Sequence, residues 1–221
     1  MPVLEVIACS VADAVAAQKG GAGRLEVVRA PEVGGLTPPI SLVREIAAAV
    51  SIPVRVILRE NEGFEIGDRQ ELRKLCDIAR ELALLEIDGV VLGFLRDGSL
   101  DLAAAQQILS CAPRVKATFH RAFEELEDQQ TALATLKTVQ QFDRILVSPS
   151  RVSDLKQLAE NAAPELIIVA GGGVDRENIR PLRESAAIRE FHVGRAARRG
   201  GSTHQPVDAA LVQELAALVS G

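Results

Sequence analysis

The sequence predicts an α/β protein built as one closed (β/α)8 barrel of the TIM type. Short runs rich in β-branched residues recur about every 25 residues, and an amphipathic segment lies between each pair, which is typical of parallel strands joined by helices. A chain of 221 residues with 48% hydrophobic residues is large enough to bury the core of such a barrel. Neither a linker nor a low-complexity tract divides the chain, so we expect a single domain over residues 1–221.

Eight strands are expected, and a helix follows each of them. The segments between the strands place apolar residues at the i, i+3, i+4 and i+7 positions of a helix, as residues 43–50 do. Ser10, Asp68 and Asp175 each stand where a capping side chain would accept a first-turn backbone amide. The last helix is predicted near residues 207–219. The predicted strands cover residues 3–9, 23–29, 53–58, 87–93, 114–120, 143–148, 165–170 and 189–193.

The structural alternative is an open, doubly wound parallel sheet, which the same alternation of strands and helices would allow. A closed barrel is favoured because the eight regular units show no obvious reversal of strand order. The first strand-to-helix loop also lacks a GxGxxG sequence, so a dinucleotide site is not expected.

Composition argues against two classes of partner. The formal net charge is −5, and the chain contains neither Trp nor Tyr, so the basic surface and most of the stacking surface of a nucleic-acid-binding protein are absent. No apolar run approaches the roughly 20 residues that span a bilayer, and no basic segment precedes a signal-like core at the N-terminus. We therefore expect no nucleic-acid partner, no membrane partner and a cytoplasmic location. Cys9, Cys76 and Cys111 form no CxxC pair, which fits free thiols in a reducing compartment.

Two carboxylates interrupt strands that should otherwise be apolar. Glu5 and Glu26 fall on the alternating positions that are predicted to face the interior of the barrel, and their strands are neighbours. A buried carboxylate needs a cation, and Arg59 and Arg121, at the ends of two other strands, are the candidate partners. These residues form either a structural ion network or a site for acid–base catalysis and substrate binding.

Two of the three histidines fall at the C-terminal ends of strands, where barrel enzymes carry their chemistry. His120 lies in TFHRAF and His192 in REFHVG, whereas His204 lies in a polar segment that is predicted to be a solvated loop. The strand of His192 would neighbour the strand of Glu5, while His120 would lie across the cavity. A histidine at a strand end can also be scaffold, but two at one face favour a functional site.

Glycines follow the last two strands. Gly171, Gly172 and Gly173 lead directly into a predicted helix start, and Gly194 and Arg195 follow the eighth strand. The loops after these two strands bind phosphate in many barrels of this type, because backbone amides and a helix N-terminus point at the anion. The alternative is that the glycines permit a tight turn with positive φ.

Several short segments share their order and spacing with a known family: LEVIACS, GGAGRLEVV, EVGGLTPP, VILRE, DGVVLG, TFHRAFE, DRILVS, AGGGV and EFHVGRA. Along nearly the whole chain they resemble the CutC family of copper-homeostasis proteins. The resemblance implies a TIM-like barrel, a role in copper handling, a cytoplasmic location and a homo-oligomer.

The sequence departs from the pattern of this family at the residues that matter for copper. Members of the family read EVC and ELC on the first two strands, whereas Ile7 and Val28 occupy the matching positions here. Cu(I) prefers thiolate ligands, so direct copper binding at the barrel mouth is not expected to be strong. Cys9 is the one thiol near the mouth that could serve as a metal ligand, and Cu(I), weakly bound, is the only cofactor left open.

Three hypotheses follow from the sequence. The first is a CutC-like protein of copper homeostasis, and the second is a barrel enzyme that uses acid–base chemistry on a small metabolite bearing a phosphate or carboxylate. The third is an inactive barrel that serves as an interaction module. In the second, His120 is the acid/base, with Glu5, Glu26 and His192 as further catalytic candidates. The candidate substrate-binding residues are Arg59, Arg121, Gly171, Gly172, Gly173, Gly194 and Arg195.

Overall fold

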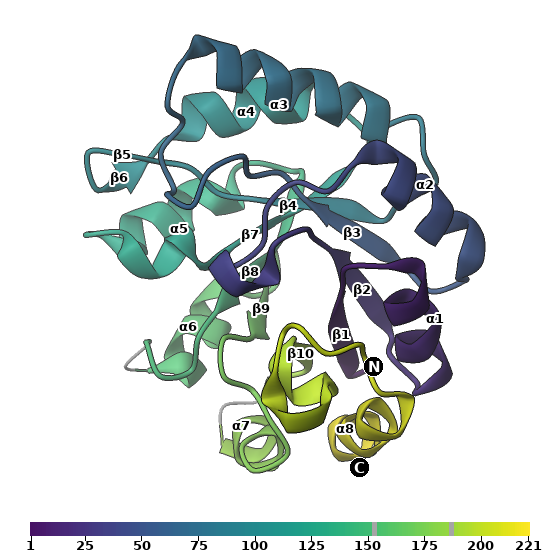
Figure 1. Cartoon of the computed structure of the whole chain (residues 1–221). Coiled ribbons are helices and arrows are strands. Elements are labelled where there is room, and N and C mark those ends of the chain that lie inside the picture. Colours follow the sequence, from purple (N-terminus) through teal and green to yellow (C-terminus); the bar gives the residue numbers. More distant parts are fainter. Residues whose placement is uncertain (152–153, 186–187) are drawn as a thin grey trace.

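A closed barrel of eight parallel strands forms the centre of the molecule, and helices surround it (Figure 1). The computed structural model describes residues 1–151, 154–185 and 188–221. Around the barrel the strands follow the order β1-β10-β9-β8-β7-β4-β3-β2, so the predicted closed barrel is confirmed and the open sheet is excluded. The barrel strands are β1 (Val3–Ala8), β2 (Arg24–Val27), β3 (Val54–Ile57), β4 (Gly89–Leu92), β7 (Lys116–Phe119), β8 (Phe142–Val147), β9 (Ile167–Ala170) and β10 (Glu190–Val193).

The helices follow the strands as predicted, and the last one begins and ends within two residues of the predicted range 207–219. Ser10 Oγ accepts from the backbone amide of Asp13, and Asp68 and Asp175 each accept two amides of their own first turns. The side-chain amide of Asn178 also donates a hydrogen bond to the backbone carbonyl of Gly173 in the preceding glycine loop. The helices are α1 (Val11–Lys19), α2 (Ile40–Ala49), α3 (Arg69–Leu82), α4 (Leu102–Ser110), α5 (Gln129–Lys137), α6 (Leu155–Ala162), α7 (Ile179–Ser185) and α8 (Ala209–Ser220).

The loops contain short elements that were not predicted from the sequence. A hairpin of β5 (Leu95–Arg96) and β6 (Ser99–Leu100) separates β4 from α4. Single 3-10 turns lie at the C-terminal side of the barrel strands: η1 (Pro31–Val33), η2 (Arg121–Glu125), η3 (Arg195–Ala197) and η4 (Arg199–Gly201). In the described part of the chain, no helix is long and apolar enough to cross a membrane.

Alternation along each strand divides the barrel into two environments. Leu4, Val6 and Ala8 of β1 pack outward against the helices, together with the outward residues of the other strands, and form the main hydrophobic core. Between them, Glu5 and Ile7 face the interior. A small apolar layer of Val28, Ile57 and Val91, with Ile7 and Cys9 beside it, fills the interior near the C-terminal ends of the strands.

The interior near the N-terminal ends of the strands is filled by a buried ion network. Arg24 bridges Glu5 and Glu190, and Arg144 donates to the same Glu190 at 2.7 Å. Arg55 continues the network on the opposite wall, where its guanidinium binds two aspartates. The network fills the interior at this end of the barrel, and the large polar cavity opens at the other end.

Candidate functional site

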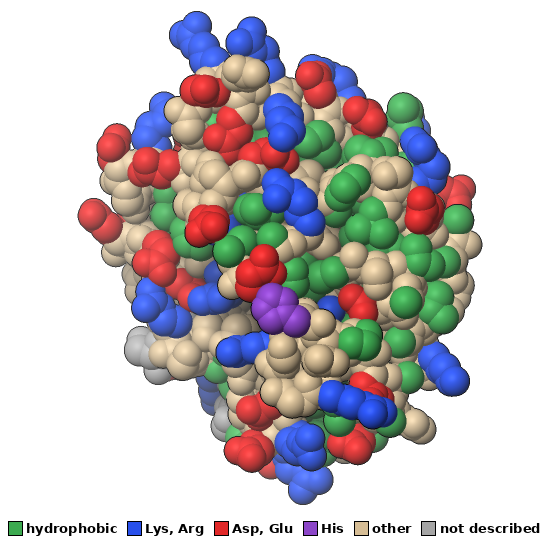
Figure 2. Space-filling model, viewed as in Figure 1, with side chains coloured by type: hydrophobic (Ala, Val, Ile, Leu, Met, Phe, Trp, Pro, Cys, Tyr) green, Lys and Arg blue, Asp and Glu red, His purple; other side chains and the backbone are tan. Residues whose placement is uncertain are grey.

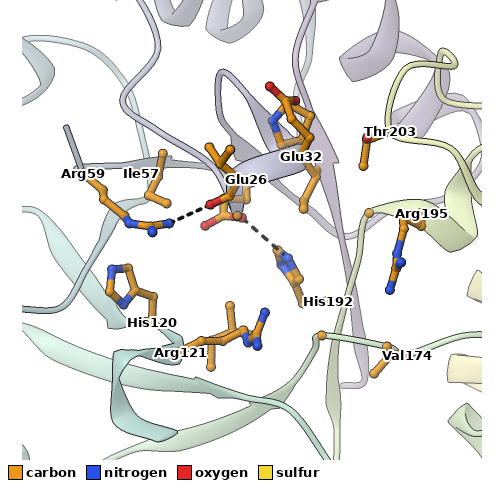
Figure 3. Close-up of a pocket in the computed structure, with 18 of the residues that line it drawn as sticks. Glu26, Glu32, Ile57, Arg59, His120, Arg121, Val174, His192, Arg195 and Thr203 are labelled. Atoms are coloured by element: carbon orange, nitrogen blue, oxygen red, sulfur yellow. Dashed lines mark hydrogen bonds and ion pairs between the residues drawn. The ribbon is translucent and has the colours of Figure 1, made fainter. Parts of the chain in front are cut away.

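A cavity of about 470 Å³ opens at the C-terminal ends of the barrel strands (Figure 3). This volume is within the range of pockets that hold small metabolites. Figure 2 shows basic and acidic side chains mixed over the face viewed in Figure 1, without a large region of one sign. The polar residues that line the cavity are Glu26, Glu32, Arg59, His120, Arg121, His192, Arg195 and Thr203, and the lining also includes Gly172, Gly173 and Gly194.

His192 lies between the two predicted carboxylates, because strand register places Glu5 of β1 beside His192 of β10. Its Nδ1 is 2.8 Å from Glu5 Oε1, and its Nε2 is 3.6 Å from Glu26 Oε2. Burial alone would lower the pKa of His192, but the two carboxylates raise it above its ordinary value. His192 therefore favours the protonated form and forms an ion pair with the acids on either side.

The partners of Glu5 differ from the predicted ones. Arg59 and Arg121 were the candidate cations, but Glu5 pairs with Arg24 and His192. Burial acts to raise the pKa of Glu5, yet Arg24 and His192 hold it well below its usual range. Glu5 therefore stays ionised behind His192 and does not line the cavity, which makes it a residue that positions His192.

Glu26 occupies the most unusual electrostatic environment in the cavity. Its side chain is buried, and His192 is its one ion-pair partner among the described residues. Burial raises the pKa of Glu26 to about 7. The positive charge of His192 acts to lower this pKa, and the negative charge of Glu5 acts to raise it further. A carboxyl with this pKa exchanges its proton near neutral pH, as a general acid or base must.

His120 lies on the opposite wall of the cavity, and its ring is held in one protonation state. The backbone amide of Ala122 donates to its Nδ1 at 3.2 Å, so the ring proton belongs on Nε2. Burial and the nearby charge of Arg59 lower the pKa of His120 to about 3, and the ring stays neutral. Among the buried side-chain nitrogen and oxygen atoms of residues 1–151, 154–185 and 188–221, Nε2 is the one without a hydrogen-bond partner.

Arg59 shapes the cavity wall and is not held by a carboxylate. Its guanidinium donates to the backbone carbonyls of Val33, Gly35, Gly63 and Glu62 and lies 4.9 Å from the ring centroid of Phe64. The Phe64 ring in turn lies 5.1 Å from His120. Arg59 therefore fixes the loop after β3 over His120 and leaves its own positive charge at the cavity.

Two further arginines approach the cavity from the opposite side to Arg59. The Arg121 side chain is half exposed and pairs loosely with Glu124, at 3.3 Å. The side chain of Arg195 is exposed, and in the described part of the chain its guanidinium forms no hydrogen bond or ion pair. Both guanidinium groups are available to an anionic ligand.

Packing and turn geometry account for the glycines. A Cβ on Gly171 would lie 2.6 Å from a methyl group of Leu146 and 3.0 Å from the His192 ring, so only glycine lets β9 approach His192. Gly172 and Gly173 adopt φ values of +70° and +117°, which favour glycine. A Cβ on Gly194 would lie 2.9 Å from Ile7. These constraints support the turn interpretation, and the anion site at these loops stays a prediction.

The barrel mouth offers a poor environment for a metal ion. Cys9 packs beside the apolar layer, outside the cavity lining, and burial raises the pKa of its thiol to about 11 despite the nearby charge of Arg198. Cu(I) sites in proteins use more than one soft ligand, and Cys9 is the single thiol near this end of the barrel. No group of three or more His, Cys, Asp or Glu residues in the described ranges is arranged to hold a metal.

Sequence reasoning identified the charged residues and histidines of the cavity lining except Glu32, and it missed Phe64 in the wall and Arg24 behind it. Arg24 carries the same strand parity as Glu26, and that parity was the signal that could have placed it inside the barrel. Phe64 belongs to an irregular loop, and no sequence pattern indicates that its ring covers His120. Glu26, Arg59, His120 and His192 line one cavity, whereas Glu5, which was predicted to join them, lies behind His192 outside the lining.

The closed barrel and the polar cavity at its C-terminal mouth define a TIM-barrel protein with a site of the kind that binds small molecules. The profile of the CutC family matches residues 3–197. The chain therefore belongs to the CutC family, as its sequence motifs predicted.

Individual relatives agree with this assignment. The mouse copper homeostasis protein cutC homolog is 34% identical over 223 residues, which cover 97% of this chain and 81% of that protein. A family protein CutC from Xanthomonas axonopodis pv. citri (strain 306) is 35% identical over 196 residues, covering 86% of this chain and 81% of the relative.

Solved structures give the same fold. A crystal structure of CutC from Streptococcus agalactiae has a TM-score of 0.81 at 27% identity and covers 88% of this chain and 98% of that one. Phosphoribosylanthranilate isomerase from Thermotoga maritima has a TM-score of 0.68 at 13% identity over the whole of both chains. At that identity the likeness concerns the fold alone.

Proposed function

We propose that the barrel mouth binds a small anionic metabolite and catalyses a proton transfer on it. Glu26 exchanges the proton, His120 donates a hydrogen bond to the oxygen on which negative charge develops, and the arginines at the rim bind the anionic group. The substrate class is a small molecule that bears a carboxylate or phosphate beside a carbonyl.

The observation that carries this proposal is the unpartnered Nε2–H of His120. A buried donor without a partner costs free energy in the free protein, about 1–3 kcal/mol, and this cost is recovered when an acceptor of the ligand binds. A donor that is fixed in advance stabilises an oxyanion without reorganisation. The Ala122 amide on Nδ1 supports this role because it fixes which nitrogen carries the proton.

Proton exchange falls to Glu26 and not to His120. A histidine with a pKa of about 3 is a poor proton acceptor at neutral pH, whereas a carboxyl with a pKa of about 7 is well matched to that task. A neutral imidazole donor opposite a carboxylate base is a known division of roles in barrel enzymes. His192, held by Glu5, favours the ionised form of Glu26 through its charge.

The charge of the lining supports an anionic ligand. Arg59 has no carboxylate partner, the pairing of Arg121 with Glu124 is loose, and Arg195 is unpaired within the described residues. The buried acids are already neutralised, Glu5 by Arg24 and Glu26 by His192. An anion that enters the mouth therefore meets uncompensated positive charge.

Thermal unfolding in the presence of inorganic phosphate, sulfate, malonate and ribose 5-phosphate tests the binding step. At least one of these probes should raise the unfolding temperature, since a ligand at 100 times its Kd adds about 2.7 kcal/mol. The increase should vanish in His120→Phe and shrink in Arg121→Gln. Lys156→Gln, a change of an exposed side chain on α6, is the matched control and should retain it. If no probe shifts the transition, anion binding at the mouth is refuted.

Solvent exchange tests the proton transfer. A probe that binds and has a C–H bond next to its carbonyl should exchange that hydrogen for deuterium in D2O, as followed by NMR. The rate should rise as the pH passes through about 7, because Glu26 must be ionised to accept the proton. Glu26→Gln should abolish exchange while binding persists. If the wild type binds a probe without exchanging its hydrogen, the mouth is a binding site only and the proposed proton transfer is wrong.

Copper homeostasis is the second candidate function, and the names of the relatives favour it. The barrel mouth does not favour a direct role in it, because Cys9 is the single thiol there and lies outside the cavity lining. The cytoplasmic location and the homo-oligomer stay predictions.

A further inference from the structure

We propose a Cu(I) site on the outside of the barrel, formed by the thiols of Cys76 and Cys111 where α3 and α4 pack together. This site is separate from the barrel mouth and does not depend on the function proposed there. Figure 1 shows α3 and α4 side by side in the outer layer of helices. From the sequence, both cysteines were expected to be free thiols, and neither was a candidate metal ligand.

Both thiols converge on one atom. Cys76 Sγ lies 3.9 Å from the backbone carbonyl oxygen of Gln107, and Cys111 Sγ lies 3.5 Å from the same oxygen. Cys76 belongs to the buried face of α3, and Cys111 is the C-terminal cap of α4, one turn after Gln107. Helix packing therefore brings together two sulfurs that are 35 residues apart in the sequence.

The pKa of the Cys76 thiol also reflects how close Cys111 lies to it. Burial, followed by the hydrogen bond and the charge of Cys111, raises the pKa of the Cys76 thiol to about 11. Each thiol thus lies within the electrostatic reach of the other. Arg80, one turn along α3, acts in the opposite direction and favours a thiolate, although it is itself paired with Asp77.

Two thiols without further ligands favour Cu(I) over other metals. Cu(I) is soft, prefers sulfur and accepts two-coordinate geometry, whereas structural Zn²⁺ requires about four ligands. In the part of the chain that the structure describes, no third His, Cys, Asp or Glu joins the pair to form such a set. Binding breaks two S–H bonds, forms two Cu–S bonds and releases two protons to solvent, while copper stays in the +1 state.

Access and charge are compatible with this site. Cys111 is half exposed and provides the entry, while Cys76 is buried behind it. The bound complex carries one negative charge, since two thiolates meet one monovalent cation. Arg80 is close enough to offset that charge.

Anaerobic titration with Cu(I) in competition with bathocuproine disulfonate tests the proposal. The reduced wild-type protein, with three titratable thiols, should retain one Cu(I) per chain and show the ultraviolet thiolate-to-copper charge-transfer band. Cys9→Ser is the matched control and should retain both properties. Cys111→Ser and Cys76→Ala should each lose the band, and their affinity should fall by more than the roughly 10–100-fold that loss of an outer-shell partner costs.

Each outcome decides the question. Cys111→Ser changes a half-exposed cap, so its result stands even if Cys76→Ala does not fold. If the chelator removes all copper from the wild type, or if Cys111→Ser binds as the wild type does, the site is refuted. If only Cys9→Ser loses copper, the metal belongs at the barrel mouth and the proposal is wrong. Anion binding at the mouth should be unchanged in Cys111→Ser, so failure here and failure of the mouth proposal are distinguishable.

Discussion

Replacing Glu26 with glutamine should stabilise the protein at alkaline pH and leave its stability unchanged in mild acid. Burial raises the pKa of Glu26 from 4.5 to about 7 in the folded protein. A raised folded-state pKa adds stability that is fully present below the unfolded pKa and is lost as the pH rises through the folded pKa. At about 1.4 kcal/mol for each pH unit, the interval from 4.5 to about 7 corresponds to about 3 kcal/mol.

Urea denaturation across a pH series measures this effect. The free energy of unfolding of the wild type should fall between about pH 5 and about pH 8, partly because His192, whose pKa is also raised, contributes in the same direction. In Glu26→Gln the Glu26 contribution is gone, and the His192 contribution shrinks because the charge of Glu26 is the first of the charges that raise the pKa of His192. The variant should therefore exceed the wild type by about 3 kcal/mol at the alkaline end and match it at the acid end.

Glu32→Gln is the matched control, because Glu32 is an exposed carboxylate at the rim of the same cavity. It should not reproduce the pH-dependent gain. A constant difference between Glu26→Gln and the wild type over the whole pH range would refute the argument, because that result would mean that Glu26 titrates alike in the folded and unfolded chains.

Three further predictions follow from the buried contacts. Arg24→Met should cost about 3–5 kcal/mol in urea denaturation, because Glu5 and Glu190 would stay buried without their shared cation; a loss below about 1 kcal/mol would contradict this. Gly171→Ala should lower stability by about 1–3 kcal/mol and weaken anion binding in calorimetry, because the added Cβ would collide with β8 and the His192 ring; unchanged binding would count against the role of that ring. His120→Asn should keep anion binding within about tenfold of the wild type, since it retains a neutral donor, whereas His120→Phe should abolish it.

The sequence was sufficient to predict the barrel and the rim of the site because both depend on local patterns. Alternation along β1 and β2 placed Glu5 and Glu26 inside, and the position of His120 and His192 at strand ends placed them at the mouth. The pairing of Glu5 with Arg24 was missed because it depends on the stagger between β1 and β2. That stagger follows from how the whole barrel closes, and no single strand encodes it.

The roles of the two sides of the cavity could not be assigned from the sequence for a related reason. As residue types, His120 is the natural proton carrier at neutral pH and Glu26 is the natural permanent anion. Burial reverses this, since it holds His120 neutral and, against the charge of His192, moves the titration of Glu26 into the neutral range. Three-dimensional packing, through the Ala122 amide on one side and the His192–Glu5 pair on the other, sets both states.

The same reasoning separates the two proposed sites by chemistry and by location. The mouth offers fixed positive charge and hydrogen-bond donors, which suit a hard anionic ligand, and Cys9 is the one thiol near it. The contact between α3 and α4 offers two sulfurs on one carbonyl, which suit a soft cation. Ile7 and Val28 bring no thiol to the barrel interior, so a copper function in this chain would use sulfur ligands elsewhere. Cys76 and Cys111 are the pair of thiols that the fold brings together. Copper binding that survives Cys9→Ser but not Cys111→Ser would place the copper ligands on the outer helices and not in the barrel mouth.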